Sequence, residues 1–155
     1  MCIRDSSNSN FKAISLRYFN PIGAHSSSMI GELPIGVPQN LVPFITQTAI
    51  GLRKELTVFG NDYPTSDGSC LRDYIHVMDL AKAHIKSLYK LINNEDKSYY
   101  DTFNIGTGKG TSVLELIKCF ENVTENKLNF KIGDRREGDV AELSLIHISE
   151  PTRPY

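Results

Sequence analysis

Two arginines in separate polar segments are the side chains best suited to bind a charged ligand. Arg72 lies in the segment Leu71-Arg-Asp-Tyr74, and Arg136 lies in Asp134-Arg-Arg-Glu-Gly-Asp139. The planar guanidinium group pairs well with two oxygens of a phosphate or carboxylate, so two such arginines could clamp a diphosphate. Surface ion pairing with the neighbouring acidic residues Asp73, Asp134 or Glu137 explains the same pattern at least as well. Both interpretations therefore stay open at this point.

A glycine-rich segment, Gly106-Thr-Gly-Lys-Gly110, is a second candidate for binding phosphate, because it lies between an expected strand and an expected helix. A Walker loop requires GxxxxGK followed by Ser or Thr, but Gly110 follows Lys109 here. The dinucleotide fingerprint GxGxxG also fails, because Thr111 occupies the position of the third glycine. A tight turn between strand and helix is the favoured interpretation.

Two asparagines and one phenylalanine could add contacts to a polar ligand with a flat ring. Asn20 and Asn40 can both donate and accept hydrogen bonds. Each has a simpler explanation, the end of a strand for Asn20 and the first turn of a helix for Asn40. Phe59 precedes Gly60 at an expected strand end and could stack on a ring, although such a residue more often belongs to the core.

Other reaction chemistries find little support in the residue pattern. His25, His76 and His84 show no metal-ligand spacing with one another or with cysteine, so we expect no metal site. No nucleophile elbow, Cys/His pair or carboxylate pair is evident. From the residues alone we therefore predict a soluble α/β domain with an anion-binding face, and no particular reaction.

Alternating strand and helix patterns must position these side chains, which indicates the α/β class. A capping box, Ser112-Val-Leu-Glu115, indicates the start of a helix at residue 112. Asn20-Pro21 is expected to end the first strand and Asp79 to cap the second helix. Strands are predicted at residues 11–19, 56–59, 71–77, 101–105 and 128–132, and helices at 39–52, 79–92 and 112–123.

Composition limits the partners and the compartment. The chain has 155 residues, and its 17 basic and 18 acidic residues give a net charge of −1. This balance gives no electrostatic reason to expect nucleic acid or an anionic membrane as a partner. No apolar run is long enough for a membrane helix, and the first residues lack the apolar region of a signal peptide. The widely spaced Cys2, Cys70 and Cys119 indicate reduced thiols, so we expect a cytoplasmic protein.

Both ends of the chain resemble translated sequencing adapter. One coding of residues 1–6 has a reverse complement that translates as Leu-Ser-Leu-Ile-His-Ile, the sequence of residues 143–148. We therefore expect residues 1–6 and 143–155 to be adapter-derived and residues 7–142 to be the genuine segment. The underlying DNA tests this expectation, which fails if either end lacks the inverted repeat.

The central segment resembles the UDP-glucose 4-epimerase family, NAD-dependent enzymes within the extended short-chain dehydrogenases. The similarity rests on Leu16-Arg-Tyr-Phe-Asn-Pro-Ile-Gly-Ala-His25, Gly60-Asn-Asp-Tyr-Pro-Thr65 and Arg72-Asp-Tyr-Ile-His-Val-Met-Asp-Leu80. It continues through Phe103-Asn-Ile-Gly-Thr-Gly108 and Arg135-Arg-Glu-Gly-Asp139. The resemblance implies the last strands of a Rossmann domain with the small substrate-binding domain, truncated. It also implies interconversion of UDP-glucose and UDP-galactose through a 4-keto intermediate with bound NAD.

The resemblance assigns roles to ten residues of this chain. It places Phe19 at the nicotinamide end of the NAD site and Asn20 at the diphosphate region of the sugar nucleotide. It makes Arg72 and Arg136 the diphosphate arginines, which favours the clamp over surface pairing. The remaining implied substrate contacts are Asn40 and Leu41 for the nucleotide, Thr57, Val58 and Phe59 for the uracil, and Asp139 for the ribose.

The same resemblance places catalysis outside this chain. The family's fingerprint glycines, its Ser/Thr and its Tyr-xxx-Lys pair lie upstream of the matching segment, so the chain alone is expected to be inactive. A homodimeric whole protein is implied, although the dimer helices of the family also lie largely upstream. A position that helps set the family's tolerance of N-acetylated sugars is occupied here by Leu143. Because Leu143 is the first residue expected to derive from adapter, the breadth of substrates stays open. Alternatives are another NAD-dependent sugar-nucleotide epimerase or dehydratase, and a non-catalytic sugar-nucleotide-binding module.

Overall fold

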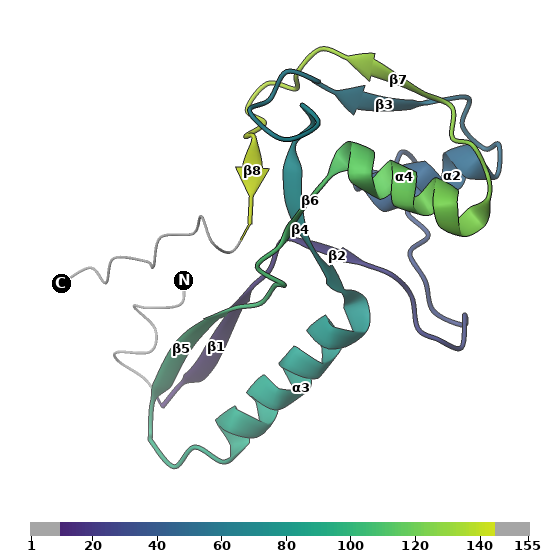
Figure 1. Ribbon diagram of the computed structural model, residues 1–155. Coiled ribbons are helices and arrows are strands. Elements are labelled where there is room, and N and C mark those ends of the chain that lie inside the picture. The colour runs from purple at the N-terminus through teal and green to yellow at the C-terminus, as the bar shows by residue number, and fades with distance from the viewer. Residues whose placement is uncertain (1–9, 145–155) are drawn as a thin grey trace.

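The computed structural model of the chain describes residues 10–144, which form three small sheets and three helices (Figure 1). This arrangement confirms the α/β class. Two of the sheets are parallel strand pairs, β1–β5 and β3–β7, and the third is built around β4. The strands are β1 (Lys12–Arg17), β2 (Asn20–Ile22), β3 (Leu56–Phe59), β4 (Leu71–His76), β5 (Tyr99–Asn104), β6 (Gly110–Ser112), β7 (Phe130–Gly133) and β8 (Glu142–Leu143). The helices are α2 (Leu41–Ala49), α3 (Val77–Ile92) and α4 (Val113–Thr124).

The main hydrophobic core lies where β3 and β7 meet α2 and α4, in the upper part of Figure 1. Strand β3 alternates between buried and more exposed residues, which is the period of two expected when one face of a strand is covered. Helices α2 and α4 each contribute one fully buried isoleucine from the apolar stripe, Ile45 and Ile117. The core residues are Ile45, Leu56, Val58, Ile117 and Leu128.

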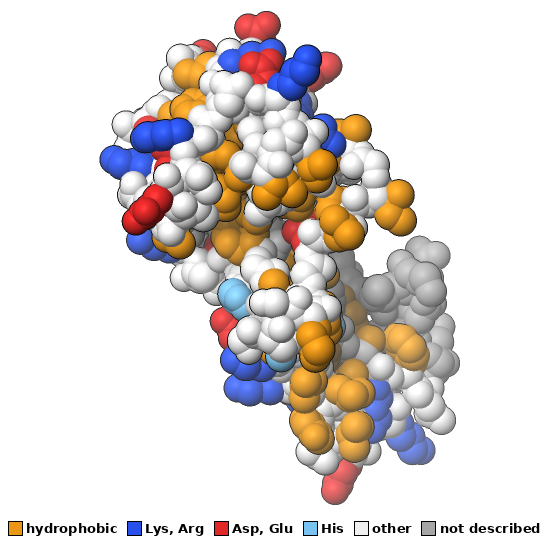
Figure 2. Space-filling view, turned by 90° about the vertical axis from the view of Figure 1, so that its right-hand side faces the viewer, with side chains coloured by type: hydrophobic (Ala, Val, Ile, Leu, Met, Phe, Trp, Pro, Cys, Tyr) orange, Lys and Arg blue, Asp and Glu red, His pale blue; other side chains and the backbone are white. Residues whose placement is uncertain are grey.

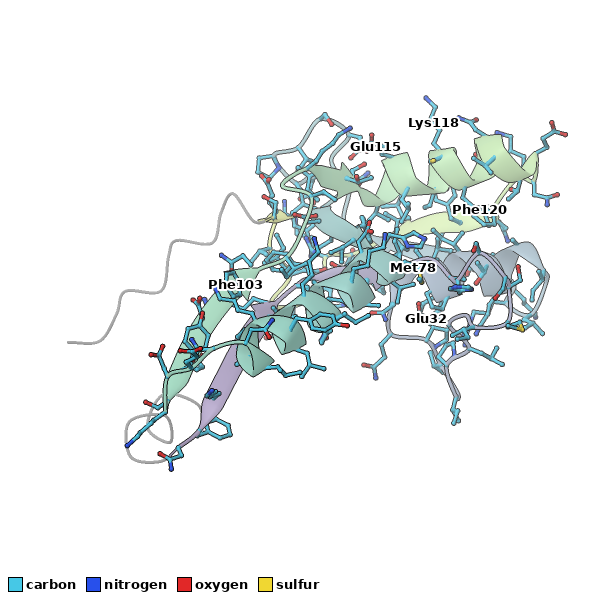
Figure 3. All side chains as sticks on the ribbon, turned by 90° about the horizontal axis from the view of Figure 1, so that it is seen from below. Glu32, Met78, Phe103, Glu115, Lys118 and Phe120 are labelled. Carbon is cyan, nitrogen blue, oxygen red and sulfur yellow. The ribbon has the colours of Figure 1, made fainter. Side chains whose placement is uncertain are left out.

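Helix α4 begins where the sequence predicts. The Ser112 hydroxyl accepts from the Glu115 amide at 2.9 Å, and the Glu115 carboxylate accepts from the Ser112 amide, so the predicted capping box is confirmed. Figure 3 shows Phe120 on the side of α4 that faces β7 and Lys118 on the opposite side. The helix is therefore amphipathic, with its apolar stripe turned toward the core.

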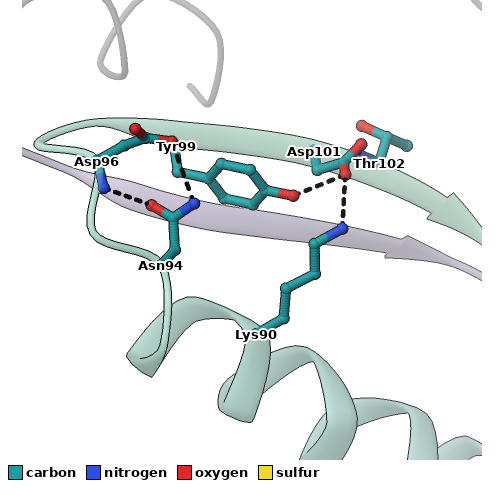
Figure 4. A network of polar contacts seen from close by, with 6 residues as sticks. All are labelled: Lys90, Asn94, Asp96, Tyr99, Asp101 and Thr102. Atoms are coloured by element: carbon teal, nitrogen blue, oxygen red, sulfur yellow. Dashed lines mark hydrogen bonds and ion pairs between the residues drawn. The ribbon is translucent and has the colours of Figure 1, made fainter.

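The β1–β5 pair carries α3 along one side (Figure 1). Polar contacts join the end of α3 to β5, as Figure 4 shows. The Asp101 carboxylate accepts from the Tyr99 hydroxyl at 2.8 Å and from Lys90 at 3.3 Å. The Asp96 amide donates to the Asn94 side chain, which fixes the turn between helix and strand. These contacts orient the strand that leads into the Gly106–Gly110 segment.

Hydrophobic side chains gather on the surface of the lower part of the molecule, where α3 lies (Figure 2). The outer side of this helix exposes Ile85, Leu88, Tyr89 and Ile92 by more than half of their surface. A second exposed set follows β2 in the connection to α2, namely Met29, Ile30, Leu33, Ile35 and Val37. Many apolar side chains of the described residues therefore lie outside the main core and are exposed to solvent.

Three short strands were missed by the sequence patterns, and all of them join the sheet built on β4. Strand β2 pairs in parallel with β4, β6 pairs antiparallel, and β8 pairs in parallel. The predicted first strand does end before Asn20-Pro21, at Arg17, but Pro21 was not expected to belong to a strand itself and lies inside β2. Proline fits there because β2 lies at the edge of this sheet, where its missing N–H group costs no ladder bond.

Two helix starts differ from prediction. His76, and not Asp79, caps α3, because its Nδ1 atom accepts from the Met78 amide at 3.1 Å. Asp79 instead lies in the first turn, where it pairs with Lys82 at 3.0 Å. Helix α2 is shorter than predicted at both ends, because Asn40 is its N-cap residue and Gly51 follows its end with φ of +77°.

The predicted adapter segments fall almost entirely outside residues 10–144. Leu143 and Ser144 are the exceptions, and Leu143 lies in β8 opposite Arg72. No helix in the described part of the chain has the length and apolar character needed to cross a membrane.

Candidate functional site

A cavity of about 590 Å³ lies beside the main core and collects most of the predicted binding residues. Its walls come from the start of α2, from β3, from β4 and from the segment after β7. Sequence positions far apart in the chain therefore meet in one place. Eight of the ten predicted site residues line this cavity, namely Asn20, Asn40, Leu41, Thr57, Phe59, Arg72, Arg136 and Asp139.

Arg72 is the best-anchored cation of the cavity. Its Nη2 atom donates to the Asp139 carboxylate at 2.7 Å, and its Nη1 atom donates to the carbonyls of Leu71 and Val140. The side chains of Arg72 and Asp139 are only 12% and 22% exposed. Arg72 does pair with an acid, but with Asp139 and not with the three neighbours considered from sequence. This pairing fixes the plane of the guanidinium group at the cavity wall.

Arg136 and Phe59 form another part of the cavity wall. The guanidinium carbon of Arg136 lies 4.5 Å from the centroid of the Phe59 ring, which is a cation–π contact. Phe59 is 38% exposed, whereas Val58 beside it is 1% exposed. The ring is therefore part of the cavity wall and not of the core. A flat base could stack on such a ring with the cation nearby.

Asn40 and Leu41 bring the start of α2 to the cavity. Asn40 is the N-cap residue, but its side chain makes no cap hydrogen bond and donates to the Glu32 carboxylate at 3.0 Å. Glu32 comes from the segment between β2 and α2, below α2 in Figure 3. The Asn40 side chain thus does not cap the amides of Leu41 and Val42, and Pro43 has no amide N–H; the positive end of a helix favours an anion.

Two predicted site residues do not line the cavity. Phe19 lies between β1 and β2 and is partly buried. Val58 belongs to the main core because alternate residues of β3 face opposite sides. Thr57 and Phe59 share the side of β3 that reaches the cavity.

Cys70 and Tyr74 also line the cavity but were not predicted. They flank Arg72 at a spacing of two residues, so the alternation of an extended chain places Arg72 and Tyr74 of β4 on one side together with Cys70, which directly precedes the strand. Extending that alternation from Arg72 would have found both. Burial raises the pKa of the Cys70 thiol and raises the pKa of Tyr74 to about 12. Both groups therefore enter the cavity as neutral side chains at neutral pH.

The Gly106–Gly110 segment is a structural turn. The Asp73 carboxylate, which is 1% exposed, accepts from the Thr107 amide at 2.9 Å and from the Gly108 amide at 3.0 Å. It also accepts from the Thr107 hydroxyl at 2.7 Å. These two amides are thus bonded to a carboxylate of the same chain, which excludes them as a phosphate cradle. The segment is thus a turn, as predicted, but it leads from β5 into the short strand β6, which begins at Gly110, and not directly into a helix.

The three histidines that were considered as metal ligands make contacts with nearby residues of the chain. His25 contacts Ser27, His76 caps α3, and His84 lies within hydrogen-bond distance of the Leu80 carbonyl. Within residues 10–144 no group of three or more His, Cys, Asp or Glu side chains has the arrangement of a metal site.

Comparison with curated proteins gives close relatives. The chain is 53% identical over 126 residues to the UDP-glucose 4-epimerase of Bacillus subtilis (strain 168), covering 81% of the chain and 36% of that protein. It is 54% identical over 149 residues to UDP-glucose 4-epimerase 4 of Oryza sativa subsp. japonica, covering 96% of the chain and 40% of that protein. The chain thus spans well under half the length of these relatives.

Solved structures of epimerases share the fold. A UDP-glucose 4-epimerase from Stenotrophomonas maltophila, with bound NAD and formylated UDP-arabinopyranose, matches with a TM-score of 0.81 and 51% identity over 88% of this chain and 40% of that one. A Bifidobacterium longum UDP-glucose 4-epimerase, in complex with NAD⁺ and UDP, matches with a TM-score of 0.78 and 45% identity over 88% of this chain and 39% of that one. The family model for NAD dependent epimerases and dehydratases matches residues 1–106. The chain therefore belongs to the NAD dependent epimerase/dehydratase family.

Proposed function

We propose that the chain is the sugar-nucleotide-binding part of a UDP-glucose 4-epimerase, which interconverts UDP-glucose and UDP-galactose. The observation that carries this proposal is the cavity with Arg72 and Arg136 on two walls and the Phe59 ring beside Arg136. Two arginine side chains suit a diphosphate, and an exposed aromatic ring suits a base. The two relatives quoted above, which cover most of the chain, carry this enzyme name.

Binding far from the reacting carbon fits the proposed reaction. The hexose must present both faces of C4 to the cofactor, while the nucleotide end stays fixed. Arg72, held by Asp139 and two carbonyls, provides a rigid anchor for that end. Anchoring one end of a substrate keeps the reacting group at high effective concentration during rotation. Asn20, Asn40 and Asp139 offer further hydrogen-bonding groups in the same cavity.

NAD would supply the hydride chemistry when bound, by accepting the C4 hydride and returning it. Phe19 is the residue of this chain that we propose to contact NAD, and it directly precedes Asn20 of the cavity. Residues 10–144 offer no glycine-rich loop for the cofactor's pyrophosphate, because the Gly106–Gly110 turn is bonded to Asp73. The remaining NAD contacts and the catalytic Tyr/Lys pair are proposed to lie outside the segment that the chain shares with its relatives.

Three further parts of the proposal concern the whole protein. We propose a cytoplasmic, homodimeric enzyme without nucleic-acid or membrane partners. We also propose that residues 1–6 and 143–155 derive from adapter and that residues 7–142 belong to the enzyme. Sequencing the source DNA on both sides of the reading frame tests the adapter origin, and extension of the frame would show whether GxxGxxG and Tyr-xxx-Lys motifs are present.

Calorimetric titration of the 155-residue chain with UDP tests the binding site. We expect saturable binding and a loss of affinity of about 10- to 100-fold in Arg72→Gln and in Arg136→Gln, the size of one charge-assisted hydrogen bond of about 1.5–3 kcal/mol. Lys127→Gln removes an exposed cation that does not line the cavity, so it is the matched control and should bind as the wild type does. Equal binding by all four proteins would refute the arginine clamp.

A ligand panel and a turnover assay separate the alternatives. UDP-glucose and UDP-galactose should bind more tightly than nucleotide sugars with another base, whereas a preference for a different nucleotide would favour another epimerase or dehydratase. The purified chain with NAD and UDP-galactose should give no UDP-glucose. Measurable turnover would contradict the proposal that catalysis resides outside this chain.

A further inference from the structure

Arg135 and Arg136 are consecutive, but their side chains serve different places. Arg136 covers the Phe59 ring at the cavity wall, with 4.5 Å between guanidinium carbon and ring centroid. Arg135 turns back to the segment after β3 and does not line the cavity. Because the two residues share one short stretch of backbone, whatever fixes Arg135 also limits where Arg136 can lie.

Arg135 is fixed by three contacts with Asp62 and Tyr63. Its Nε atom donates to the Asp62 carboxylate at 2.7 Å, and its Nη2 atom donates to the Asp62 carbonyl at 2.7 Å. Its guanidinium carbon lies 4.3 Å from the centroid of the Tyr63 ring. Tyr63 is 5% exposed, so the cation rests on a ring that is itself held in place. We call Arg135, Asp62 and Tyr63 the clasp.

The backbone under the clasp is shaped for this close approach. Gly60 has φ of +79°, and a Cβ atom there would lie 2.6 Å from the Tyr63 ring and 2.9 Å from Cγ of Arg135. A side chain at residue 60 would therefore collide with two members of the clasp. The Gly60 amide also donates to the Gly133 carbonyl at 2.9 Å, which extends the β3–β7 pairing beyond the strand ends.

Phe59 and Arg136 both emerge from this closed end of the strand pair. Phe59 is the last residue of β3 and lies opposite Gly133, the last residue of β7. Arg136 follows three residues later in an exposed segment. Beyond Gly133, the side-chain contacts of the clasp join the segment that contains Arg136 to the segment that follows β3. Asp139 at the far end of this segment is held by Arg72, so loss of the clasp would free the stretch between Gly133 and Asp139, in which Arg136 lies.

We propose that Arg135 is a positioning residue, which holds Arg136 against Phe59 through the clasp with Asp62 and Tyr63. The consequence for ligand binding rests on the proposed function, whereas the consequence for the position of Arg136 does not. Nuclear magnetic resonance can follow that position without any ligand, because the Phe59 ring current shifts the Nε–Hε signal of a guanidinium group lying over it.

The ligand-free experiment compares the 155-residue chain with Arg135→Gln and Asp62→Asn. Phe59→Leu identifies the ring-current shift of the Arg136 Nε–Hε signal, and Lys127→Gln is the control that removes an exposed cation elsewhere. We expect both clasp variants to move the Arg136 signal toward its position in Phe59→Leu, and the control to leave it unchanged. An Arg136 signal that stays in place in both clasp variants overturns the proposal.

A double-mutant cycle that combines Arg135→Gln with Arg136→Gln tests whether Arg135 affects UDP binding through Arg136. A general loss of stability would not depend on the residue at position 136. Arg135→Gln should weaken UDP binding about three- to tenfold when Arg136 is present, and less than about twofold when Arg136 is already Gln, as expected for coupled neighbours. Equal losses in both backgrounds would overturn the proposal. If the wild-type chain binds no UDP, the proposed function of the cavity fails, and the resonance experiment still decides the role of Arg135.

Discussion

Replacing Asp73 with asparagine should destabilise the fold strongly, because this carboxylate organises the turn after β5. One oxygen accepts from the Thr107 amide and hydroxyl, and the other accepts from the Gly108 amide. Asparagine keeps the shape of the side chain but has a single acceptor oxygen. If that oxygen faces Thr107, the new NH₂ group faces the Gly108 amide, so that two donors oppose each other.

The magnitude follows from burial and from the bonds lost. Asp73 is 1% exposed, so its carboxylate is satisfied by protein donors and not by bulk water. The change removes one hydrogen bond to a charged group and leaves the half-buried Gly108 amide facing another donor, each of which costs about 1–3 kcal/mol. We therefore expect the free energy of unfolding to fall by about 2–4 kcal/mol, allowing for partial relaxation.

Urea unfolding of the two proteins measures this difference directly. Asp101→Asn is a suitable control, because Asp101 pairs with Lys90 at 3.3 Å while its side chain is 38% exposed. The control should change the free energy of unfolding by less than about 1 kcal/mol. A loss below about 0.5 kcal/mol in Asp73→Asn would refute the assignment of this turn to Asp73.

Three other predictions concern the segment between β3 and β4 and the cavity-lining residue Tyr74 of β4. Gly68→Ala should lower the thermal midpoint markedly, because residue 68 has φ of +78° and a Cβ atom would lie 2.0 Å from the Asn61 carbonyl oxygen; an unchanged midpoint would contradict this close contact. Burial tends to raise the pKa of Asp67, but hydrogen bonds from Ser112 and Ser69 outweigh it and lower the pKa. The stability from these bonds is therefore present above the ordinary pKa of Asp and lost as the pH falls through the lowered value, so the acid dependence of unfolding should weaken in Asp67→Asn. Ultraviolet titration should show one tyrosine ionising near pH 12, and the step should disappear in Tyr74→Phe.

Local signals in the sequence predicted the elements that depend on neighbouring residues. The capping box at Ser112 and Glu115 is such a signal, since its two hydrogen bonds join residues three apart. Strand β3 was predicted with its observed bounds, because a short apolar run ends at Gly60. The short strands β2, β6 and β8 give no such signal, since each exists only through pairing with β4.

The sequence predicted most residues of the candidate site but not the long-range contacts between them. Residue chemistry alone indicated Arg72, Arg136 and Phe59 but left other roles open, the family resemblance then favoured binding, and the structure brings all three to one cavity. The pairing of Arg72 with Asp139 depends on β4 lying beside the segment after β7, which no local pattern reveals. Local acidic neighbours were therefore the wrong partners to consider. Alternation along β4 would have revealed Cys70 and Tyr74 without any structure.

The strand pairs β1–β5 and β3–β7 also affect how fast the chain can fold. Each joins residues from distant parts of the sequence, as in the pairs Lys12–Tyr99 and Leu56–Phe130. A long connection must be closed before the first ladder bond of either pair forms, so the entropy cost comes before the stabilisation. Chains dominated by such non-local pairing fold more slowly than helical bundles of similar size. During that delay the core residues Leu56 and Val58 of β3 stay exposed, so dilute refolding conditions should favour the native chain over aggregates.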